Sequence, residues 1–299
     1  MSSLRNIALV GASGSLGSPI LKKLQAANTF NIKVLRRNGS TATFPESVNV
    51  VDVDFDSVES LTAALKGQDA VVSAAGTMQI AGQTLIVDAA IAAGVKRFLP
   101  SEFGCDLDNT STRKLPVYTQ KVQVQDYIIE KSKSNDFSYT FVYNGAFLDW
   151  GIDHGFLLTT ADGKPSLIDG GDLPFSTTTL NSVADAVVGV LNHPDETKNR
   201  AVFIEDAKVT QNKLLKLAKQ AAPSKVWEPT YPKLDDLTAK ADERLSQGLL
   251  DFETFVPYLY RAVLSPGYGG NFDKTDNELL GVKGVTDADI LALFKKSLN

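Results

Sequence analysis

An apolar segment that runs directly into a glycine-rich turn, followed by a helical pattern, constrains this chain more than any other feature. Residues 6–17 read Asn-Ile-Ala-Leu-Val-Gly-Ala-Ser-Gly-Ser-Leu-Gly. Gly11 permits a tight turn, Gly14 leaves bare backbone for a pyrophosphate, and Gly17 lets the helix lie close to the strand. Residues 18–27 carry apolar side chains at helical spacing, so the amides at the start of this helix should face an anion. The order strand, glycine turn, helix predicts a dinucleotide site.

Composition narrows the classes of function. The chain has 299 residues and a net charge of −5 without a basic stripe, so we expect no nucleic-acid or membrane partner. One cysteine, Cys105, excludes an internal disulfide, and we expect neither a signal peptide nor a membrane span. Two histidines, His154 and His193, are too few for a His/Cys metal cluster, and no G-x-S-x-G motif is present. These features favour a cytoplasmic monomer or homodimer that binds a small molecule and no metal.

The alternation of apolar runs with helical patterns indicates an α/β protein. Strands are expected at residues 32–35, 48–53, 70–74, 97–100 and 139–143, with helices between them. This rhythm is typical of a doubly wound parallel sheet, the Rossmann fold. We expect residues 1–150 to form the dinucleotide-binding domain. Residues 151–299 are expected to form a smaller α+β substrate domain, some segments of which return to the sheet. In that part we expect helices at residues 182–191, 210–222, about 234–247 and 252–264, the last bent or started by Pro257.

The end of the second strand indicates which cofactor the site takes. An acidic residue there would bind the adenosine ribose, whereas a cation would accommodate a 2′-phosphate. Arg36 and Arg37 stand at this position, and a guanidinium binds phosphate bidentately, so NADP(H) is favoured over NAD(H). The alternative is a pair of solvated arginines. Asp54 and Phe55 follow the third strand, where the adenine would lie, although an Asp here can equally cap a helix.

A motif after the fifth strand carries a family resemblance. Pro-Ser-Glu-Phe-Gly at 100–104 directly follows Lys-Arg-Phe, and together with the glycine turn and the arginine after strand two it resembles the isoflavone reductase-like family. That family comprises phenylpropenoid and lignan ether reductases within the wider NmrA-like, atypical short-chain dehydrogenase/reductase group. Residues 143–150, Tyr-Asn-Gly-Ala-Phe-Leu-Asp-Trp, resemble its fungal branch. The resemblance implies an NADPH-binding N-terminal domain, a C-terminal substrate domain, and hydride transfer to an aromatic or conjugated secondary metabolite.

The resemblance also implies that Lys121 is the catalytic group, because a lysine on the helix after this loop has that role in the family. A lysine near the nicotinamide ribose can hold the cofactor, and a pKa lowered by burial would let it move a proton to or from a substrate oxygen. Tyr118 shares its helical face, but the Y-x-x-x-K spacing of conventional short-chain dehydrogenases is one residue longer, so Tyr118 receives no acid role. Cys105 departs from the family pattern and is expected to be a structural thiol. The alternative for Lys121 is a solvated surface lysine.

Aromatic residues beyond the sixth strand are candidates for the substrate pocket. The Asn-Gly pair at 144–145 is expected to turn the chain over the nicotinamide. Phe147, Trp150 and His154 could then line a pocket wall, because aromatic faces pack on planar substrates, and His154 could exchange a proton. The alternatives are ordinary core positions for Phe147 and Trp150, and a bystander role for His154.

The small residues at the end of the fourth strand would let a cofactor lie across it, or would simply permit close helix packing. The full set of candidate cofactor-binding residues is Gly11, Ser13, Gly14, Ser15, Leu16, Gly17, Arg36, Arg37, Asp54, Phe55, Ser73, Ala74, Ala75, Gly76, Ser101, Glu102, Phe103, Lys121, Tyr143, Asn144 and Gly145. Two further functions stay open. One is a non-catalytic NmrA-like dinucleotide sensor that binds a protein partner, against which Lys121 argues. The other is an isomerase or cyclase that uses its cofactor transiently or not at all.

Overall fold

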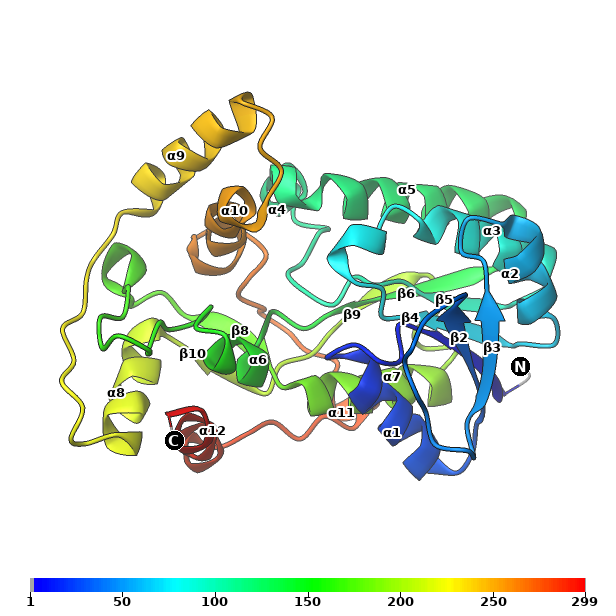
Figure 1. Cartoon of the computed structure of the whole chain (residues 1–299), viewed down its shortest axis with the longest axis horizontal. Coiled ribbons are helices and arrows are strands. Elements are labelled where there is room, and N and C mark those ends of the chain that lie inside the picture. The colour runs from blue at the N-terminus through cyan, green and yellow to red at the C-terminus, as the bar shows by residue number, and fades with distance from the viewer. Residues whose placement is uncertain (1–2, 299) are drawn as a thin grey trace.

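A seven-stranded parallel sheet forms the centre of the computed structural model, which describes residues 3–298 (Figure 1). Its strand order is β3-β2-β1-β4-β5-β6-β9, so the order reverses between β1 and β4, where ligands of doubly wound sheets bind. The strands are β1 (Asn6–Val10), β2 (Asn31–Arg37), β3 (Asn49–Val53), β4 (Ala70–Ser73), β5 (Arg97–Leu99), β6 (Ser138–Tyr143) and β9 (Arg200–Phe203). This topology confirms the predicted fold class.

Helices cover both faces of this sheet. In Figure 1, α2 (Val58–Leu65), α3 (Gln83–Ala92) and α5 (Thr119–Ser134) lie above it, and α1 (Gly17–Ala27) and α7 (Leu180–Asn192) lie below it. The buried side chains of α1, Ile20, Leu21 and Leu24, recur at helical spacing and join the same core cluster as Val183 and Val187 of α7. A short helix, α11 (Asn277–Leu280), packs on the outer side of α7.

The remaining elements form a second layer at one end of the molecule. Within residues 3–298, β7 (Ala146–Phe147), β8 (Phe175–Thr178) and β10 (Ala207–Val209) make a three-stranded sheet. The other helices are α4 (Thr110–Arg113), α6 (Leu148–Asp153), α8 (Gln211–Ala221), α9 (Leu234–Ser246), α10 (Phe252–Leu264), α12 (Asp287–Leu298) and the 3₁₀ turns η1 (Thr77–Gln79), η2 (Pro116–Tyr118) and η3 (Ile168–Gly170). Because α7 and β9 return to the main sheet, residues after 150 contribute to both layers.

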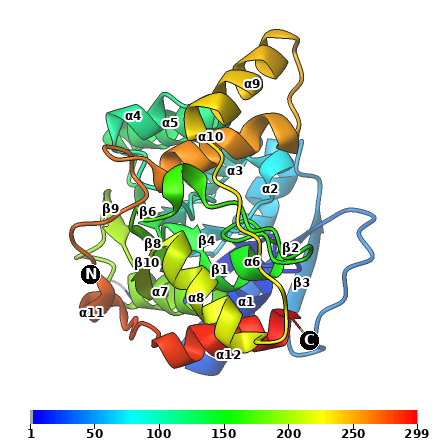
Figure 2. The same cartoon turned by 90° about the vertical axis from the view of Figure 1, so that its left-hand side faces the viewer.

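Helices α9 and α10 pack against each other and lie on the side of the molecule away from α12 (Figure 2). Pro257 was expected either to bend or to start the helix at residues 252–264, and the structure contradicts the second expectation. The helix begins at Phe252, because Asp251 accepts a hydrogen bond from the Thr254 amide at 2.9 Å and caps it, and Pro257 lies inside. The expectation that Pro257 starts this helix is therefore wrong. Among the described residues, no helix combines the length and the apolar character needed to cross a membrane.

Candidate active site

The glycine turn is shaped by contacts that leave no room for side chains. Gly11 has φ +76°, and a Cβ placed there would lie 2.3 Å from the Ala74 carbonyl oxygen at the end of β4. A Cβ on Gly17 would lie 2.0 Å from the Gly11 carbonyl oxygen. Gly14 is less constrained, since its Cβ would lie 3.3 Å from that same oxygen. Gly11 and Gly17 therefore serve the tight turn and the close approach of α1, as their spacing suggested.

The start of α1 offers backbone donors to an anion. Its N-cap residue is Leu16, and no side chain of residues 3–298 caps the helix. Ser13, Gly14 and Ser15 are exposed, so the turn is open to solvent. Uncapped amides at the positive end of a helix are a site for phosphate groups. The residues present therefore fit the pyrophosphate of a dinucleotide.

A cavity of about 570 Å³ lies beside this turn at the carboxyl ends of β1, β2 and β4. The predicted residues that line it are Gly11, Ser13, Arg36, Arg37, Phe55, Ala75 and Gly76. Sequence reasoning missed other lining residues, among them Phe44 and Gly82 in loops and Met78 and Gln79 in η1, where no motif occurs. The other candidate cofactor residues, Asp54 and Ser73 among them, do not line it. The Asp54 carboxylate instead accepts a hydrogen bond from the Asp56 amide at 3.0 Å, and Ser73 is fully buried in β4.

The two arginines after β2 are in different situations. Arg36 Nε and Nη2 lie 2.6 and 2.9 Å from the two carboxylate oxygens of Asp52, and Nη1 donates to the Ala42 carbonyl at 2.9 Å. Its guanidinium is thus already engaged. Arg37 is exposed, lies 6.0 Å from the centre of the Phe55 ring, and makes no ion pair within residues 3–298. Of the two, Arg37 is the guanidinium that a ligand in this cavity could recruit.

The loop after β5 connects the cavity to the lysine. The Ser101 hydroxyl donates to the Ala75 carbonyl at 2.8 Å, and its amide donates to Gln83 at 2.8 Å, which holds the loop against the end of β4. Lys121, in the first turn of α5, donates from Nζ to the Glu102 carbonyl oxygen. Burial of this ammonium lowers the pKa of Lys121, while the Glu102 carboxyl opposes that shift. The lysine predicted as catalytic therefore lies against the Pro-Ser-Glu-Phe-Gly loop.

Several neighbours of Lys121 are buried. Burial raises the pKa of the Cys105 thiol to about 11, which makes it a poor nucleophile at neutral pH. Tyr118 is also buried, faces Cys105, and its pKa is raised well above the ordinary value, chiefly by burial. The Glu102 side chain is 2 % exposed, and burial raises its pKa to about 7. Glu102 does not line the cavity beside the glycine turn, although it was among the candidate cofactor-binding residues.

The residues at the end of β6 contact the loop after β5. Tyr143 is fully buried and its hydroxyl accepts a hydrogen bond from Gln125 Nε2 at 2.8 Å. The amides of Asn144 and Gly145 both donate to the Gly104 carbonyl at 3.0 Å. Gly145 has φ +64°, and a Cβ there would lie 2.1 Å from the Ser176 carbonyl oxygen of β8. The Asn-Gly turn thus joins the loop after β5 to β8.

Aromatic side chains gather between α6 and α10. Trp150 stacks on His154 with ring centres 4.3 Å apart, and His154 Nδ1 lies 2.9 Å from the Trp150 carbonyl. Phe156 stacks on Tyr260 at 5.0 Å and lies 6.5 Å from Trp150. Sequence reasoning named Trp150 and His154 but missed Tyr260, which α10 brings here from more than a hundred residues away. Phe147, the other candidate, packs against the core cluster that includes α1 and α7.

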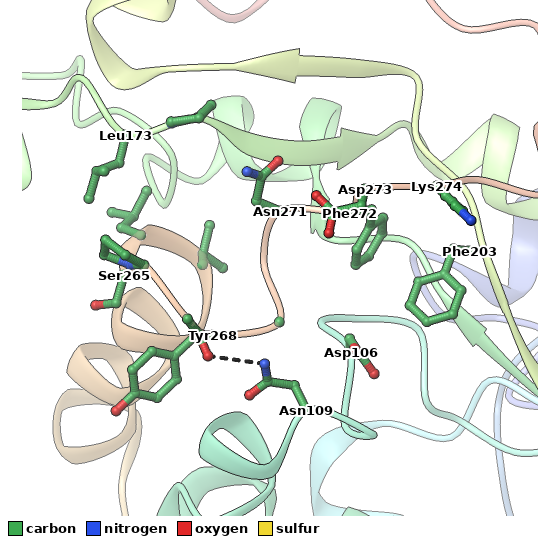
Figure 3. A pocket seen from close by; sticks show the side chains of 16 residues that line it. Asp106, Asn109, Leu173, Phe203, Ser265, Tyr268, Asn271, Phe272, Asp273 and Lys274 are labelled. Carbon is green, nitrogen blue, oxygen red and sulfur yellow. Dashed lines mark hydrogen bonds between the residues drawn. The ribbon is translucent and has the colours of Figure 1, made fainter.

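A larger cavity, about 680 Å³, lies elsewhere (Figure 3). It is bounded by the loop after β5, the residues before β8 and the loop after α10, which Asn109 Nδ2 ties down through a 3.0 Å hydrogen bond to the Gly267 carbonyl. None of the candidate cofactor or substrate residues lines it. The smaller cavity, and not this one, is lined by residues of the glycine turn.

The comparisons with known proteins agree with this geometry. The NmrA-like family model matches residues 4–246. Oxidoreductase aprR of Aspergillus flavus is 33% identical over 299 residues, which cover 97% of this chain and 98% of that protein. A crystal structure of isoflavone reductase has a TM-score of 0.78 at 24% identity and covers 97% of this chain and 99% of its own.

A binary complex of leucoanthocyanidin reductase with NADPH from Vitis vinifera has a TM-score of 0.80 at 19% identity, covering 97% of this chain and 99% of its own. Both structural likenesses establish the shared fold. The family model spans most of the chain, and the Aspergillus relative matches nearly its whole length. This chain therefore belongs to the NmrA-like family and is an oxidoreductase.

Proposed function

We propose that the chain is an NADPH-dependent reductase that transfers hydride to an aromatic or conjugated small molecule. The observation that carries this proposal is the position of Lys121 against the loop that Ser101 anchors to the edge of the dinucleotide-sized cavity. The leucoanthocyanidin reductase of the same fold was solved with NADPH, and isoflavone reductase acts, by its name, on an isoflavone. Both support the proposed cofactor and substrate class.

The cofactor half of the proposal uses the glycine turn and one arginine. The exposed backbone of residues 13–15 and the uncapped start of α1 would bind the pyrophosphate. Arg37 would bind the 2′-phosphate, because the guanidinium of Arg36 is held by Asp52. Phe55 beside Arg37 offers a flat face for the adenine. When bound, the cofactor supplies the hydride.

The substrate half uses Lys121 and the aromatic cluster. Lys121 would hold the nicotinamide ribose and give a proton to the substrate, since burial lowers the pKa of this lysine and so makes its ammonium a stronger acid. Trp150, Phe156 and Tyr260 would contact a planar substrate through their rings. These three side chains form the apolar wall of the proposed pocket.

The test is NADPH consumption with a panel of conjugated phenolics and enones, comparing wild type with Lys121→Met. Methionine keeps most of the length of the stem and removes the ammonium, so we expect turnover to fall about 10²- to 10⁴-fold. NADPH binding, measured by calorimetry, should weaken far less. Lys131→Met, on the outer part of the same helix, is the control and should retain turnover. NADPH binding without turnover on any substrate would overturn the reductase and favour the dinucleotide sensor.

A further inference from the structure

The Glu102 carboxyl is a buried titratable group on the residue whose backbone carbonyl binds Lys121. Its backbone carbonyl accepts the hydrogen bond from Lys121, and its side chain is 2 % exposed. Neither carboxylate oxygen meets the distance and angle of a hydrogen bond among residues 3–298, although the Gln125 side chain lies close enough to lower the pKa of the carboxyl. A buried carboxylate without hydrogen bonds is costly unless a cation compensates its charge. The surroundings must therefore supply a cation or keep the carboxyl protonated.

The charged and titratable groups that face Glu102 come from several elements. They are Lys121 of α5, Arg113 of α4, Asp108 of the loop after β5, Tyr118 of η2 and Tyr143 of β6. The amide of Gln125 also faces the carboxyl.

Most of these groups already have partners. Arg113 Nη1 donates to Gln125 Oε1 at 2.9 Å, and Nη2 pairs with Asp126. The amide nitrogen of Gln125 donates to the Tyr143 hydroxyl. Lys121 makes no ion pair within residues 3–298, and the partner that its ammonium contacts there is the neutral Glu102 carbonyl. Lys121 is therefore the cation that can compensate Glu102.

We propose that Glu102 is a positioning residue whose carboxylate keeps Lys121 in the ammonium form needed to donate a proton. This inference rests on the proposed function of Lys121 and adds a group that acts through it. Burial by itself favours a neutral amine on Lys121 and a neutral carboxyl on Glu102. The opposite charge of each neighbour favours the charged form of both groups, so the two groups titrate together.

The consequence for pH follows from the direction of each shift. Burial raises the pKa of Glu102 to about 7, so the carboxylate forms as the pH rises through neutrality. Once formed, it raises the pKa of Lys121 and counters the desolvation that lowers it. Without the carboxylate, Lys121 would lose its proton at a lower pH, and the alkaline limb of a reduction that needs the ammonium would move to lower pH.

The direct test is an NMR titration of the full-length protein labelled with ¹³C at lysine Cε, with the Lys121 signal assigned by its loss in Lys121→Arg. In wild type we expect this signal to shift near pH 7, when Glu102 ionises beside it, and again at higher pH. In Glu102→Gln the first step should vanish and the pKa of Lys121 should fall by about one unit or more. An unchanged pKa of Lys121 in Glu102→Gln would overturn the proposal.

Two further variants separate charge from structure. Glu102→Asp keeps a carboxylate, so it should retain the step near pH 7 and most of the elevated Lys121 pKa. Asp206→Asn removes another buried carboxyl that has one unpartnered oxygen, between β9 and β10, and should leave the Lys121 titration as in wild type. If Glu102→Gln does not fold, the NMR titration of wild type tests the proposal by itself. A Lys121 signal without a step near pH 7 would contradict the interaction with Glu102.

The activity profile distinguishes this inference from the proposed function. With a substrate in hand, Glu102→Gln should move the alkaline limb of kcat/KM to lower pH by the same amount as the Lys121 pKa. If the Lys121 titration moves but no substrate consumes NADPH, the pairing stands and the reductase proposal fails. If reduction depends on Lys121 while its pKa is unaffected by Glu102→Gln, the reductase stands and the pairing fails.

Discussion

At the scale of single residues, a neighbouring strand decides which arginine is free. Arg36 and Asp52 are direct partners in the register of β2 and β3, so their side chains meet on one face of the sheet. Arg37 points elsewhere and stays exposed beside Phe55. We therefore expect Arg37→Ala to weaken NADPH binding about 10- to 100-fold, the range for a charge-assisted phosphate contact, and NADH binding little. Calorimetric titration of both cofactors checks this. Arg36→Ala is the comparison and should change both affinities alike; a selective loss of NADPH affinity in that variant would contradict the assignment.

Substitutions at two glycines of the turn should distinguish an effect on the stability of the fold from an effect on NADPH binding. Gly17→Ala would place a methyl group 2.0 Å from the Gly11 carbonyl oxygen, so we expect a loss of several kcal/mol in the free energy of unfolding, as for other overpacked sites. Gly14→Ala meets only a 3.3 Å contact and should cost about 1 kcal/mol or less, as for a mild steric change, while still obstructing the pyrophosphate. Urea unfolding and NADPH titration of both variants measure the two effects. Equal loss of stability in the two would show that Gly14 is also required by the fold.

At the scale of elements, α10 depends on an ionised cap. The Asp251 carboxylate accepts from the Thr254 amide and pairs with Arg244, and these bonds lower the pKa of Asp251 to about 2. A depressed pKa means that the contribution is present above the ordinary Asp pKa of about 4 and is lost as the pH falls towards 2. Amide hydrogen exchange in the first turn of α10 should therefore be faster in Asp251→Ala than in wild type at pH 6. Asp251→Asn keeps a good cap and should protect that turn better than alanine does. Equal protection in all three proteins would show that the cap does not hold α10.

At the scale of the whole molecule, the sheet and helices that carry the glycine turn are packed against chain segments far from them in sequence. Helix α7 and strand β9 follow residue 150, yet α7 packs on α1 and β9 pairs with β6. A fragment of residues 1–150 would expose the apolar faces of α1 and β6, so we expect it to unfold without a cooperative transition. Because a ligand binds only the folded fraction, the fragment should also bind NADPH at least about tenfold more weakly than the full chain. Circular dichroism on heating and calorimetry test this. A fragment that melts cooperatively and binds like the full chain would support an independent domain ending at 150.

Much of the fold and part of the candidate site could be predicted because the signals are local. Gly11 is required locally by its φ of +76°, and Gly17 by its approach to the nearby Gly11 carbonyl oxygen. The strand and helix patterns reflect burial with periods of two and 3.6 residues. Lys121 was predicted from the family motif that precedes it. Tyr260 could not be found in this way, because no local pattern says that α10 will lie beside α6.

The sequence by itself determined the strand, turn and helix at the N-terminus, the alternating order of elements, and the positions of the two arginines and the lysine. The tertiary structure alone decided that Asp52 engages Arg36 and leaves Arg37 free, that Tyr143 faces Gln125 rather than the cofactor cavity, and that Glu102 is enclosed behind Lys121. The physical reason is that backbone conformation follows from neighbouring residues, whereas the charge state and the partners of a side chain depend on strand register and on burial by distant segments.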